Sequence, residues 1–177
     1  MTTPTASTPG PVGDGSAPRP GLTWGLKRSF IRYISTLPDG GHQETDGASL
    51  TDGSSFHFAP APGATYDPAT GTGILTFRGD VRLTGHHGML FVMVADPWIE
   101  FRDGAAVLSV IDSRHWPDRD TRLPLATLAP AAPSVSDAGL VWAETPAHLS
   151  EAGQAVFNDQ YGAGEELDPV FVVYPVP

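Results

Sequence analysis

The sequence contains no cysteine, which excludes disulfides, iron–sulfur clusters, thiol nucleophiles and cysteine-ligated zinc. It also has few basic residues: 10 Lys and Arg stand against 20 Asp and Glu, for a formal net charge of -10, and no basic run of four or more occurs. Nucleic-acid binding and docking on an anionic membrane surface both depend on clustered positive charge. We therefore expect neither kind of partner.

Long apolar runs and common catalytic motifs are absent as well. No segment approaches the roughly 18 to 20 apolar residues that a transmembrane helix needs, so membrane insertion is not expected. The sequence has no G-x-S-x-G elbow, no H-E-x-x-H motif, no Walker loop and no G-x-G-x-x-G after a strand. The hydrolase, metalloprotease and nucleotide-binding classes that carry these motifs therefore find no support.

Glycine and proline, by contrast, are frequent, with 20 and 18 residues that recur at short intervals. Hydrophobic residues make up 40% and charged residues 17% of the chain, which is ordinary for a folded protein. Frequent Gly and Pro favour short strands and turns over a helical bundle. We predict a mainly β fold: an antiparallel sandwich- or barrel-like domain with an N-terminal helix and a short C-terminal helix.

The first 20 residues differ in composition from the rest. Residues 1–20 are small, polar and rich in Pro, Thr and Gly, so they have little to bury and are predicted to form a disordered tail. They contain neither the basic nor the apolar region of a secretory signal, and a chain that starts at Met1 in this way is expected to be cytoplasmic. Residues 21–177 are predicted to form a single domain.

A helix is predicted at the start of this domain, from Leu22 to about Ser35, with Thr23 as its cap. Spacings of three and four place Ser29, Phe30 and Tyr33 on one otherwise apolar stripe. The Ser29 hydroxyl and the Tyr33 phenol would then stand next to each other and point inward. Because an inward polar pair needs partners or a ligand, both are candidate site residues.

From Ser54 onward the sequence changes to the period of two that is typical of strands. The predicted strands of this antiparallel meander are SFHFA, ILTFRG, VRLTGHHG, MLFVMVA, PWIEF and AAVLSVIDS. The Pro-rich segment 123–136 is left unassigned. Thr145 as a cap and Pro146 at the first helical position predict a second helix that continues to about Asn158. A final strand is predicted at PVFVVY.

Three blocks of sequence occur in a fixed order along this pattern. They are W-G-x-K-x-S-F-x-x-Y (Trp24–Tyr33), the run Y-D-P-A-T-G-T-G-I-L-T-F-R-G-D-V-R-L-T-G-H-H-G with its A-D-P sequel (Tyr66–Pro97), and F-x-x-x-Y-x-A-G-x-x-L-D-P-V (Phe157–Val170). Together they resemble the signature of the HtaA domain, a haem-transport domain of actinobacteria. The resemblance implies ferric haem b as the ligand.

The resemblance also implies a set of site residues. In that family an axial tyrosine in the first helix holds the haem iron, with a serine one turn earlier and a histidine of a G-H-x-G turn beside the phenol. By motif position these are Tyr33, Ser29 and His86. A tyrosine of the last block affects haem binding in the family, and its match is Tyr161. We expect Phe30 in the apolar lining of the haem site.

The chemistry of these residue types agrees with the resemblance. A phenolate is a hard oxygen donor that prefers ferric iron and lowers the reduction potential. Because free tyrosine has a pKa near 10, the phenolate needs either the metal or a hydrogen-bond donor, for which His86 is the candidate. In an extended segment His86 and His87 would point to opposite faces, which argues against a two-histidine metal chelate. Met89 and Phe91 are expected to complete the apolar lining.

Other polar residues are interpreted as structural or solvated. Tyr66, in the Y-D-P turn, is interpreted as a packing residue. The remaining histidines lack the spacing of a joint metal site and are interpreted as surface or edge residues: His42, His57, His115 and His148. The carboxylates of the last block are interpreted as solvated rather than as an acid–base or calcium site: Glu165, Glu166 and Asp168.

Three functional classes stay open at this point. The first is a haem-binding protein for storage, delivery or transport. The second is a cytoplasmic biosynthetic-pathway enzyme that uses the same pocket on a small apolar metabolite, with Tyr33 and His86 as an acid–base pair. The third is a scaffold or partner-binding β domain without a ligand. The candidate partners are haem, a second copy of the chain, a haem-transfer protein and a small-molecule substrate. By the resemblance, HtaA domains usually lie at the cell surface, behind a signal peptide and often before an anchor, and we expect neither segment in this chain.

Overall fold

The computed structural model describes residues 18–176 of the 177-residue chain, and this part is mainly β and antiparallel, as predicted. Up to residue 17, the predicted disordered tail lies outside the described residues. The strands are β1 Gly21–Trp24, β2 Gly41–Thr45, β3 Ala48–Thr51, β4 Ser55–Pro60, β5 Gly73–Arg78, β6 Asp80–Gly85, β7 Leu90–Ala95, β8 Trp98–Arg102, β9 Ala105–Ile111, β10 Arg122–Leu128, β11 Ser134–Ser136, β12 Gly139–Leu149 and β13 Glu166–Tyr174. The helical elements are α1 Arg28–Thr36 and the 3₁₀ helices η1 His86–Gly88, η2 Ser113–His115 and η3 Ala152–Phe157.

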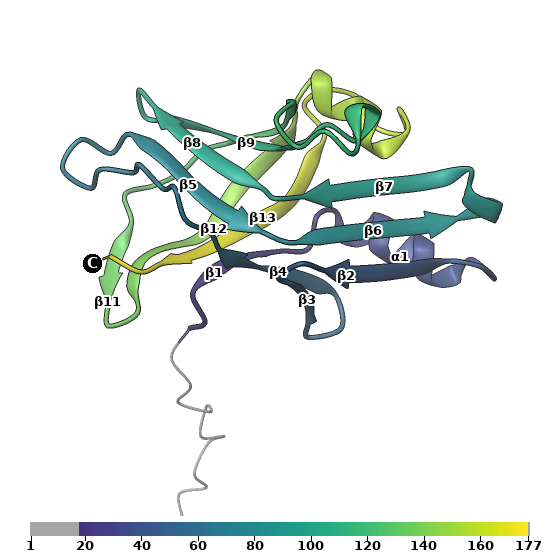
Figure 1. Cartoon of the computed structure of the whole chain (residues 1–177), viewed down its shortest axis with the longest axis horizontal. Helices are drawn as coiled ribbons and strands as arrows, with labels where there is room; N and C mark the ends of the chain where they lie inside the picture. The colour runs from purple at the N-terminus through teal and green to yellow at the C-terminus, as the bar shows by residue number, and fades with distance from the viewer. Residues whose placement is uncertain (1–17, 177) are drawn as a thin grey trace, which may run out of the picture.

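The strand pairings form a closed, barrel-like ring. The large sheet has the order β1-β13-β12-β10-β9-β8-β5-β4-β3, and β4 also pairs with β1, which joins the path into a ring. A second sheet, with the order β2-β6-β7, is covalently continuous with this ring because β6 follows β5 and β7 leads into β8. Figure 1 shows this second sheet extending away from the ring, with α1 beside it.

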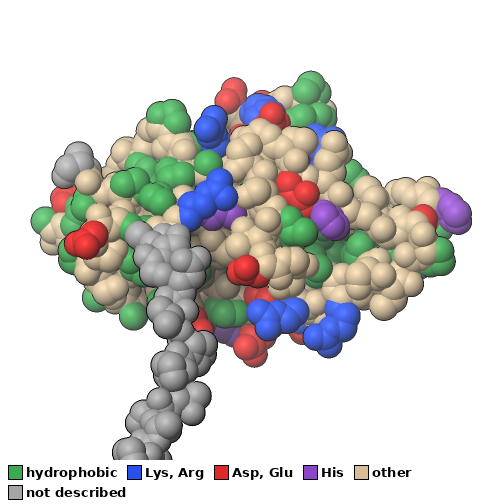
Figure 2. All heavy atoms as spheres, turned by 90° about the horizontal axis from the view of Figure 1, so that it is seen from below, with side chains coloured by type: hydrophobic (Ala, Val, Ile, Leu, Met, Phe, Trp, Pro, Cys, Tyr) green, Lys and Arg blue, Asp and Glu red, His purple; other side chains and the backbone are tan. Residues whose placement is uncertain are grey.

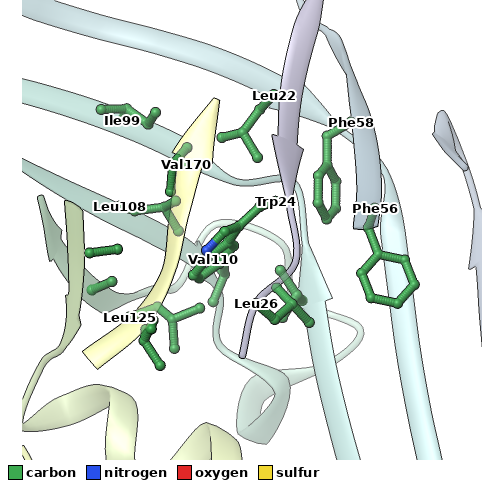
Figure 3. Close-up of a cluster of buried hydrophobic side chains, with 14 of the residues drawn as sticks. Leu22, Trp24, Leu26, Phe56, Phe58, Ile99, Leu108, Val110, Leu125 and Val170 are labelled. Atoms are coloured by element: carbon green, nitrogen blue, oxygen red, sulfur yellow. The ribbon is translucent and has the colours of Figure 1, made fainter. Parts of the chain in front are cut away.

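The hydrophobic core fills the interior of the ring. In Figure 3 side chains from six strands and the β1–α1 loop converge there: Leu22, Trp24, Leu26, Phe56, Phe58, Ile99, Leu108, Val110, Leu125 and Val170. The indole N–H of Trp24, which is 1% exposed, donates to the carbonyl oxygen of Asp168 at 2.7 Å. Since an unpaired buried N–H is costly, this bond holds β1 against β13.

The N-terminal helix is shorter than predicted. Residues Gly21–Trp24 form strand β1, and α1 begins only at Arg28. Strand β1 is paired on both sides, with β13 and with β4, and this tertiary pairing overrides the local helix signal. Leu26 then adopts a left-handed φ of 57°, which separates the strand from the helix.

The predicted second helix begins too early. Thr145 and Pro146 belong to β12, and the helical element in this region is the short η3. Thr145 is buried, Pro146 exposed and Ala147 buried, which is the alternation of a strand. The register shifts on either side of Thr145, and these irregularities accommodate a proline inside a paired strand.

The strands predicted between residues 54 and 113 are confirmed as β4 to β9, with G-H-H-G forming the turn after β6. No strand was predicted at β2, β3, β10 or β11. Two of these, β10 and β11, lie in or overlap the Pro-rich segment that was left unassigned. The local proline content therefore hid strands that depend on their neighbours for pairing.

The described surface agrees with the charge balance of the sequence. On the face shown in Figure 2, Lys and Arg side chains stand among Asp, Glu and uncharged side chains, without a continuous basic patch on that face. Within residues 18–176, no helix has the length and apolar character required to span a membrane.

Candidate functional site

An open pocket lies between α1, the η1 turn with the start of β7, and the segment after η3. Its volume is about 360 Å³, which falls in the range of small-molecule sites. The lining residues are Phe30, Tyr33, His86, Met89, Leu90, Asn158, Gln160 and Tyr161. Of the expected apolar lining, Phe30 and Met89 border the pocket, whereas Phe91 is not among these residues.

Tyr33 and His86 meet at the wall of this pocket. The phenol oxygen Oη of Tyr33 lies 2.6 Å from Nε2 of His86, which is hydrogen-bond distance. Tyr33 comes from α1 and His86 from the turn after β6, so the fold brings together two residues that are 53 positions apart. The Tyr33 side chain is 44% exposed, which leaves the phenol accessible to a ligand.

The G-H-H-G turn directs only one of its histidines toward the pocket. His86, His87 and Gly88 have φ values of 50°, 57° and 86°, so the segment is a left-handed turn rather than the extended chain considered above. The His87 side chain is 93% exposed and does not line the pocket. Among residues 18–176 there is no group of three or more His, Asp or Glu side chains that could hold a metal ion.

Three aromatic residues, which we call the pocket cluster, meet at the pocket: Phe30 and Tyr161 line it, and the fully buried Phe157 packs against both. Their rings meet edge to face, with centroids 5.4 to 6.2 Å apart. Ser29 is exposed rather than inward-pointing. Burial raises the pKa of Tyr161, while the charge of Lys27 and the nearby Ser29 hydroxyl oppose that rise. Tyr161 therefore remains a neutral phenol at neutral pH.

Asp168 of β13 anchors the start of α1. Its carboxylate accepts a hydrogen bond from the backbone N–H of Arg28 at 3.0 Å, and its own N–H donates to the carbonyl of Leu26 at 2.9 Å. A Cβ at Gly25 would lie 2.4 Å from the Asp168 carboxylate, so glycine is needed for this approach. The interpretation of Asp168 as a solvated carboxylate is therefore wrong: it caps the helix that carries Tyr33.

Sequence reasoning missed several residues around the pocket. Lys27 lies 3.0 Å from the Glu165 carboxylate and 5.0 Å above the Tyr161 ring, and its place in W-G-x-K was the signal that could have found it. Asn158 and Gln160 line the pocket from a loop without a recognisable motif. The side-chain amide of Asn158 donates to the Phe91 carbonyl at 3.5 Å, which connects this loop to β7.

Two other interpretations have clear outcomes. Tyr66 packs on Phe101 and Trp142, with ring centroids 4.9 and 5.2 Å away, as expected of a packing residue. His57 is 2% exposed and lies 3.0 Å from both the Thr23 hydroxyl and the Pro20 carbonyl, so the surface-or-edge interpretation is wrong for this histidine. Burial is the main cause of its lowered pKa. The other three are exposed: His42, His115 and His148.

Comparisons with known proteins show which solved structures share this fold. Two solved structures from Corynebacterium glutamicum are similar over most of their length. The C-terminal domain of HtaA has a TM-score of 0.71 and 27% identity, covering 85% of this chain and 92% of that chain. The N-terminal domain of HtaA has a TM-score of 0.68 and 26% identity, covering 88% and 97%. The heme binding protein HtaB of the same organism, with a TM-score of 0.61 and 18% identity over 85% and 89%, shares the fold.

No curated protein sequence matches the chain at a significant level. The family model HtaA (Htaa), however, matches residues 20–173. This match spans nearly the whole described part of the molecule and includes the three sequence blocks, α1, the η1 turn and the segment after η3. The resemblance found in the sequence is thereby confirmed, and the chain belongs to the HtaA family.

Proposed function

We propose that this protein binds ferric haem b in the pocket, with the phenolate of Tyr33 as the axial ligand. The observation that carries the proposal is the 2.6 Å contact between Tyr33 Oη and His86 Nε2 at the wall of an open pocket. Membership of the HtaA family and the fold shared with a protein described as heme binding support the same ligand.

The residues present fit such a ligand. A phenolate oxygen suits ferric iron, and the aromatic rings that line the pocket offer apolar surface to a flat macrocycle. Leu90 is 8% exposed and Met89 is 81% exposed, so a ligand in the pocket would cover apolar surface that water now reaches at Met89. Haem would supply the iron that the phenolate ligates.

The protonation states follow from the hydrogen bond. A phenolate can only accept hydrogen bonds, so Nε2 of His86 must carry the proton and donate to Tyr33 in the ligating state. Such a donor stabilises the negative charge on the phenolate oxygen. In the ligand-free protein the phenol can instead donate to an unprotonated Nε2. The proton that the phenol gives up on ligation can pass along this hydrogen bond to Nε2 of His86, which then donates to the phenolate.

Ser29, Tyr161 and Phe30 have distinct roles in this proposal. Phe30 is 2% exposed and forms part of the apolar lining of the pocket. Ser29 is an exposed residue of the first turn of α1, and Tyr161 lines the pocket after η3. We assign these two residues to the polar edge of the haem, where neutral hydroxyl groups can donate hydrogen bonds to its carboxylates.

The open pocket also suits exchange of the ligand. With the phenol of Tyr33 exposed at the rim, a haem-transfer partner or a second copy of this chain could reach the ligand without unfolding the domain. Delivery or transport of haem is therefore the purpose that we propose for the site.

Among the described residues, no observation specifically favours the enzyme alternative. An acid–base pair in an enzyme is usually oriented by a third group, as in triads. Among the described residues the His86 ring has its one hydrogen bond to Tyr33, and the nearby Asp39 carboxylate accepts from backbone N–H groups of the turn. We therefore do not propose an enzymatic function.

The test is a titration of the purified protein with ferric haem, followed by absorption and resonance Raman spectroscopy. We expect one haem per chain with an iron–tyrosinate signature. Tyr33→Phe should abolish the signature, and His86→Ala should weaken binding by about 10- to 100-fold, as for partners that orient metal ligands.

Two matched controls come from the chain itself. Tyr66→Phe removes a packed phenol outside the pocket, and His87→Ala removes the neighbouring histidine that points to solvent. Both should bind haem like the wild type. An absence of saturable binding, or a signature that persists in Tyr33→Phe, would contradict the proposal.

A further inference from the structure

Asp39 lies in the loop between α1 and β2 and is not among the residues that line the pocket. Its carboxylate accepts hydrogen bonds from the backbone N–H of His86 at 3.2 Å and of His87 at 2.5 Å. The His87 ring lies farther away, with Nδ1 3.9 Å from the carboxylate. The principal contacts of Asp39 are thus with the backbone of the turn and not with a side chain of the site.

The turn that Asp39 contacts has an unfavourable backbone. His86 and His87 are two successive non-glycine residues with positive φ, followed by Gly88. Left-handed conformations are disfavoured for residues with a Cβ and persist where surrounding contacts hold them. In this conformation successive N–H groups point to one side and form a concavity suited to an anion. The Asp39 carboxylate occupies that concavity.

The pKa of Asp39 agrees with this role. The hydrogen bond from the His87 backbone is the main cause that lowers it, and the one from His86 acts in the same direction. The carboxylate is therefore ionised at neutral pH, which strengthens both backbone hydrogen bonds.

Asp39 is also tied to the helix that carries Tyr33. The loop after α1 closes tightly, because the Gly40 N–H donates to the Leu37 carbonyl at 3.2 Å and a Cβ at Gly40 would meet the Ile34 carbonyl. Leu37 in turn packs against Gly85, where a Cβ would lie 2.6 Å from its side chain. The end of α1 and the end of β6 are thereby held in contact, and Asp39 lies at this junction.

We propose that Asp39 is a positioning residue that holds the η1 turn in its left-handed form and so sets the contact between His86 and Tyr33. The phenol needs no such support, because its helix is anchored separately at Asp168. The imidazole depends on a turn of three residues. Loss of the Asp39 carboxylate should therefore move His86 while leaving Tyr33 in place. The consequence for haem affinity rests on the proposed function.

The first test uses the ligand-free protein and does not depend on haem. Nuclear Overhauser contacts between the rings of Tyr33 and His86 should be present in the wild type and lost in Asp39→Ala. Asp67→Ala is the matched control, since Asp67 also accepts a backbone N–H within a turn, from Ala69 at 2.9 Å, but borders no part of the pocket. Ring contacts that persist in Asp39→Ala would overturn the proposal.

The second test measures haem affinity in two backgrounds. Asp39→Ala should weaken binding by about tenfold in the wild type, similar to other residues that orient a metal ligand. In the His86→Ala background the same substitution should cause no further loss, because its effect passes through His86. An equal loss in both backgrounds would show that Asp39 acts by another route and would overturn the proposal.

A conservative variant separates positioning from a folding defect. The carboxylate accepts from the His86 N–H with Oδ1 and from the His87 N–H with Oδ2, and Asp39→Asn keeps only one of these acceptors. This variant should therefore retain part of the ring contact and an affinity between those of the wild type and Asp39→Ala. If it is as impaired as Asp39→Ala at the same thermal midpoint, the proposed role is wrong. If the wild type binds no haem while the ring contact still depends on Asp39, the proposed function fails and the positioning role stands.

Discussion

Two aromatic clusters border two hollows in this molecule, and they differ in the polar groups beside them. The barrel cluster of Tyr66, Phe101 and Trp142 borders a hollow of about 250 Å³, and the pocket cluster borders one of about 360 Å³. Each cluster contains one tyrosine whose pKa is raised mainly by burial, Tyr66 and Tyr161. Aromatic rings and a hollow are therefore features of both regions and do not identify a ligand site.

The difference lies in exposure and in pairing. At the pocket, a 44% exposed phenol contacts an imidazole, and an exposed methionine stands at the rim. At the barrel cluster, Phe101 is 6% and Trp142 is 4% exposed, so these side chains are committed to packing. The candidate site is therefore distinguished by an accessible polar pair beside apolar surface, whereas buried rings also occur where they serve only the fold.

The largest expected effect is on the barrel cluster. Trp142→Ala removes a buried ring that contacts both Tyr66 and Phe101, and should lower the free energy of unfolding by about 3–5 kcal/mol. Urea unfolding followed by circular dichroism measures this loss. Trp116→Ala, at a tryptophan that is 37% exposed, is the control and should cost much less. A large loss of haem affinity in the folded Trp142→Ala protein would contradict this distinction, because the barrel cluster would then also contribute to the ligand site.

A smaller loss of stability is expected at Asp168, which connects strand β13 of the ring to helix α1 of the pocket. Asp168→Ala removes the cap of α1 and should lower the free energy of unfolding by about 2 kcal/mol. Because α1 carries Tyr33, haem affinity should fall as well, unlike in Trp142→Ala. Glu166→Ala, at an exposed side chain of the same strand, should change neither quantity. Unchanged haem affinity in Asp168→Ala would show that the pocket tolerates a loosened helix start.

The sequence predicted the strands with strong alternation and failed where a local helix signal competed with tertiary pairing. Strands β4 to β9 follow the period of two directly. Thr23 and the pair Thr145-Pro146 both imitate a helix start, but pairing across the ring turned both segments into strands. Local propensity carries no information about a partner strand elsewhere in the chain, which explains these two errors.

The candidate site shows the same contrast between local sequence signals and contacts that are distant in sequence. Tyr33 and His86 were named because they occupy motif positions, and Tyr161 for the same reason. The residues that support them were not, because their roles depend on contacts distant in sequence: Asp39 acts on residues 47 and 48 positions away, and Asp168 on one 140 positions away. A carboxylate in an acidic chain has no local feature that separates a cap from a solvated side chain.

A further prediction concerns the effect of acid on stability, at a carboxylate outside the pocket lining. Hydrogen bonds from Arg114 lower the pKa of Asp112, at the end of β9, to about 2. Because the folded-state pKa lies below the unfolded value, this carboxylate stabilises the fold above about pH 4 and loses that contribution as the pH falls toward about 2. The contribution should be about 1 kcal/mol, since the Arg114 side chain is 65% exposed and screened by solvent.

Urea unfolding of the wild type and Asp112→Asn across this pH range checks the Asp112 contribution. The variant should be less stable at neutral pH, and the difference should vanish near about pH 2. A constant difference across the range would show that the lost interaction is not the ionised carboxylate. Haem affinity at neutral pH should be equal in the two proteins, because Asp112 does not line the pocket.

The smallest effect tests the exposed rim of the pocket. Met89 is 81% exposed, so Met89→Ala should change the free energy of unfolding by less than about 0.5 kcal/mol. If haem covers this side chain, the same substitution should weaken haem binding by about threefold through lost apolar contact. Val135→Ala is a matched control, since Val135 is also 81% exposed but lies on β11, outside the pocket lining. Equal haem affinity in the two variants would place the ligand away from Met89, and the apolar side of the site would then be the pocket cluster alone.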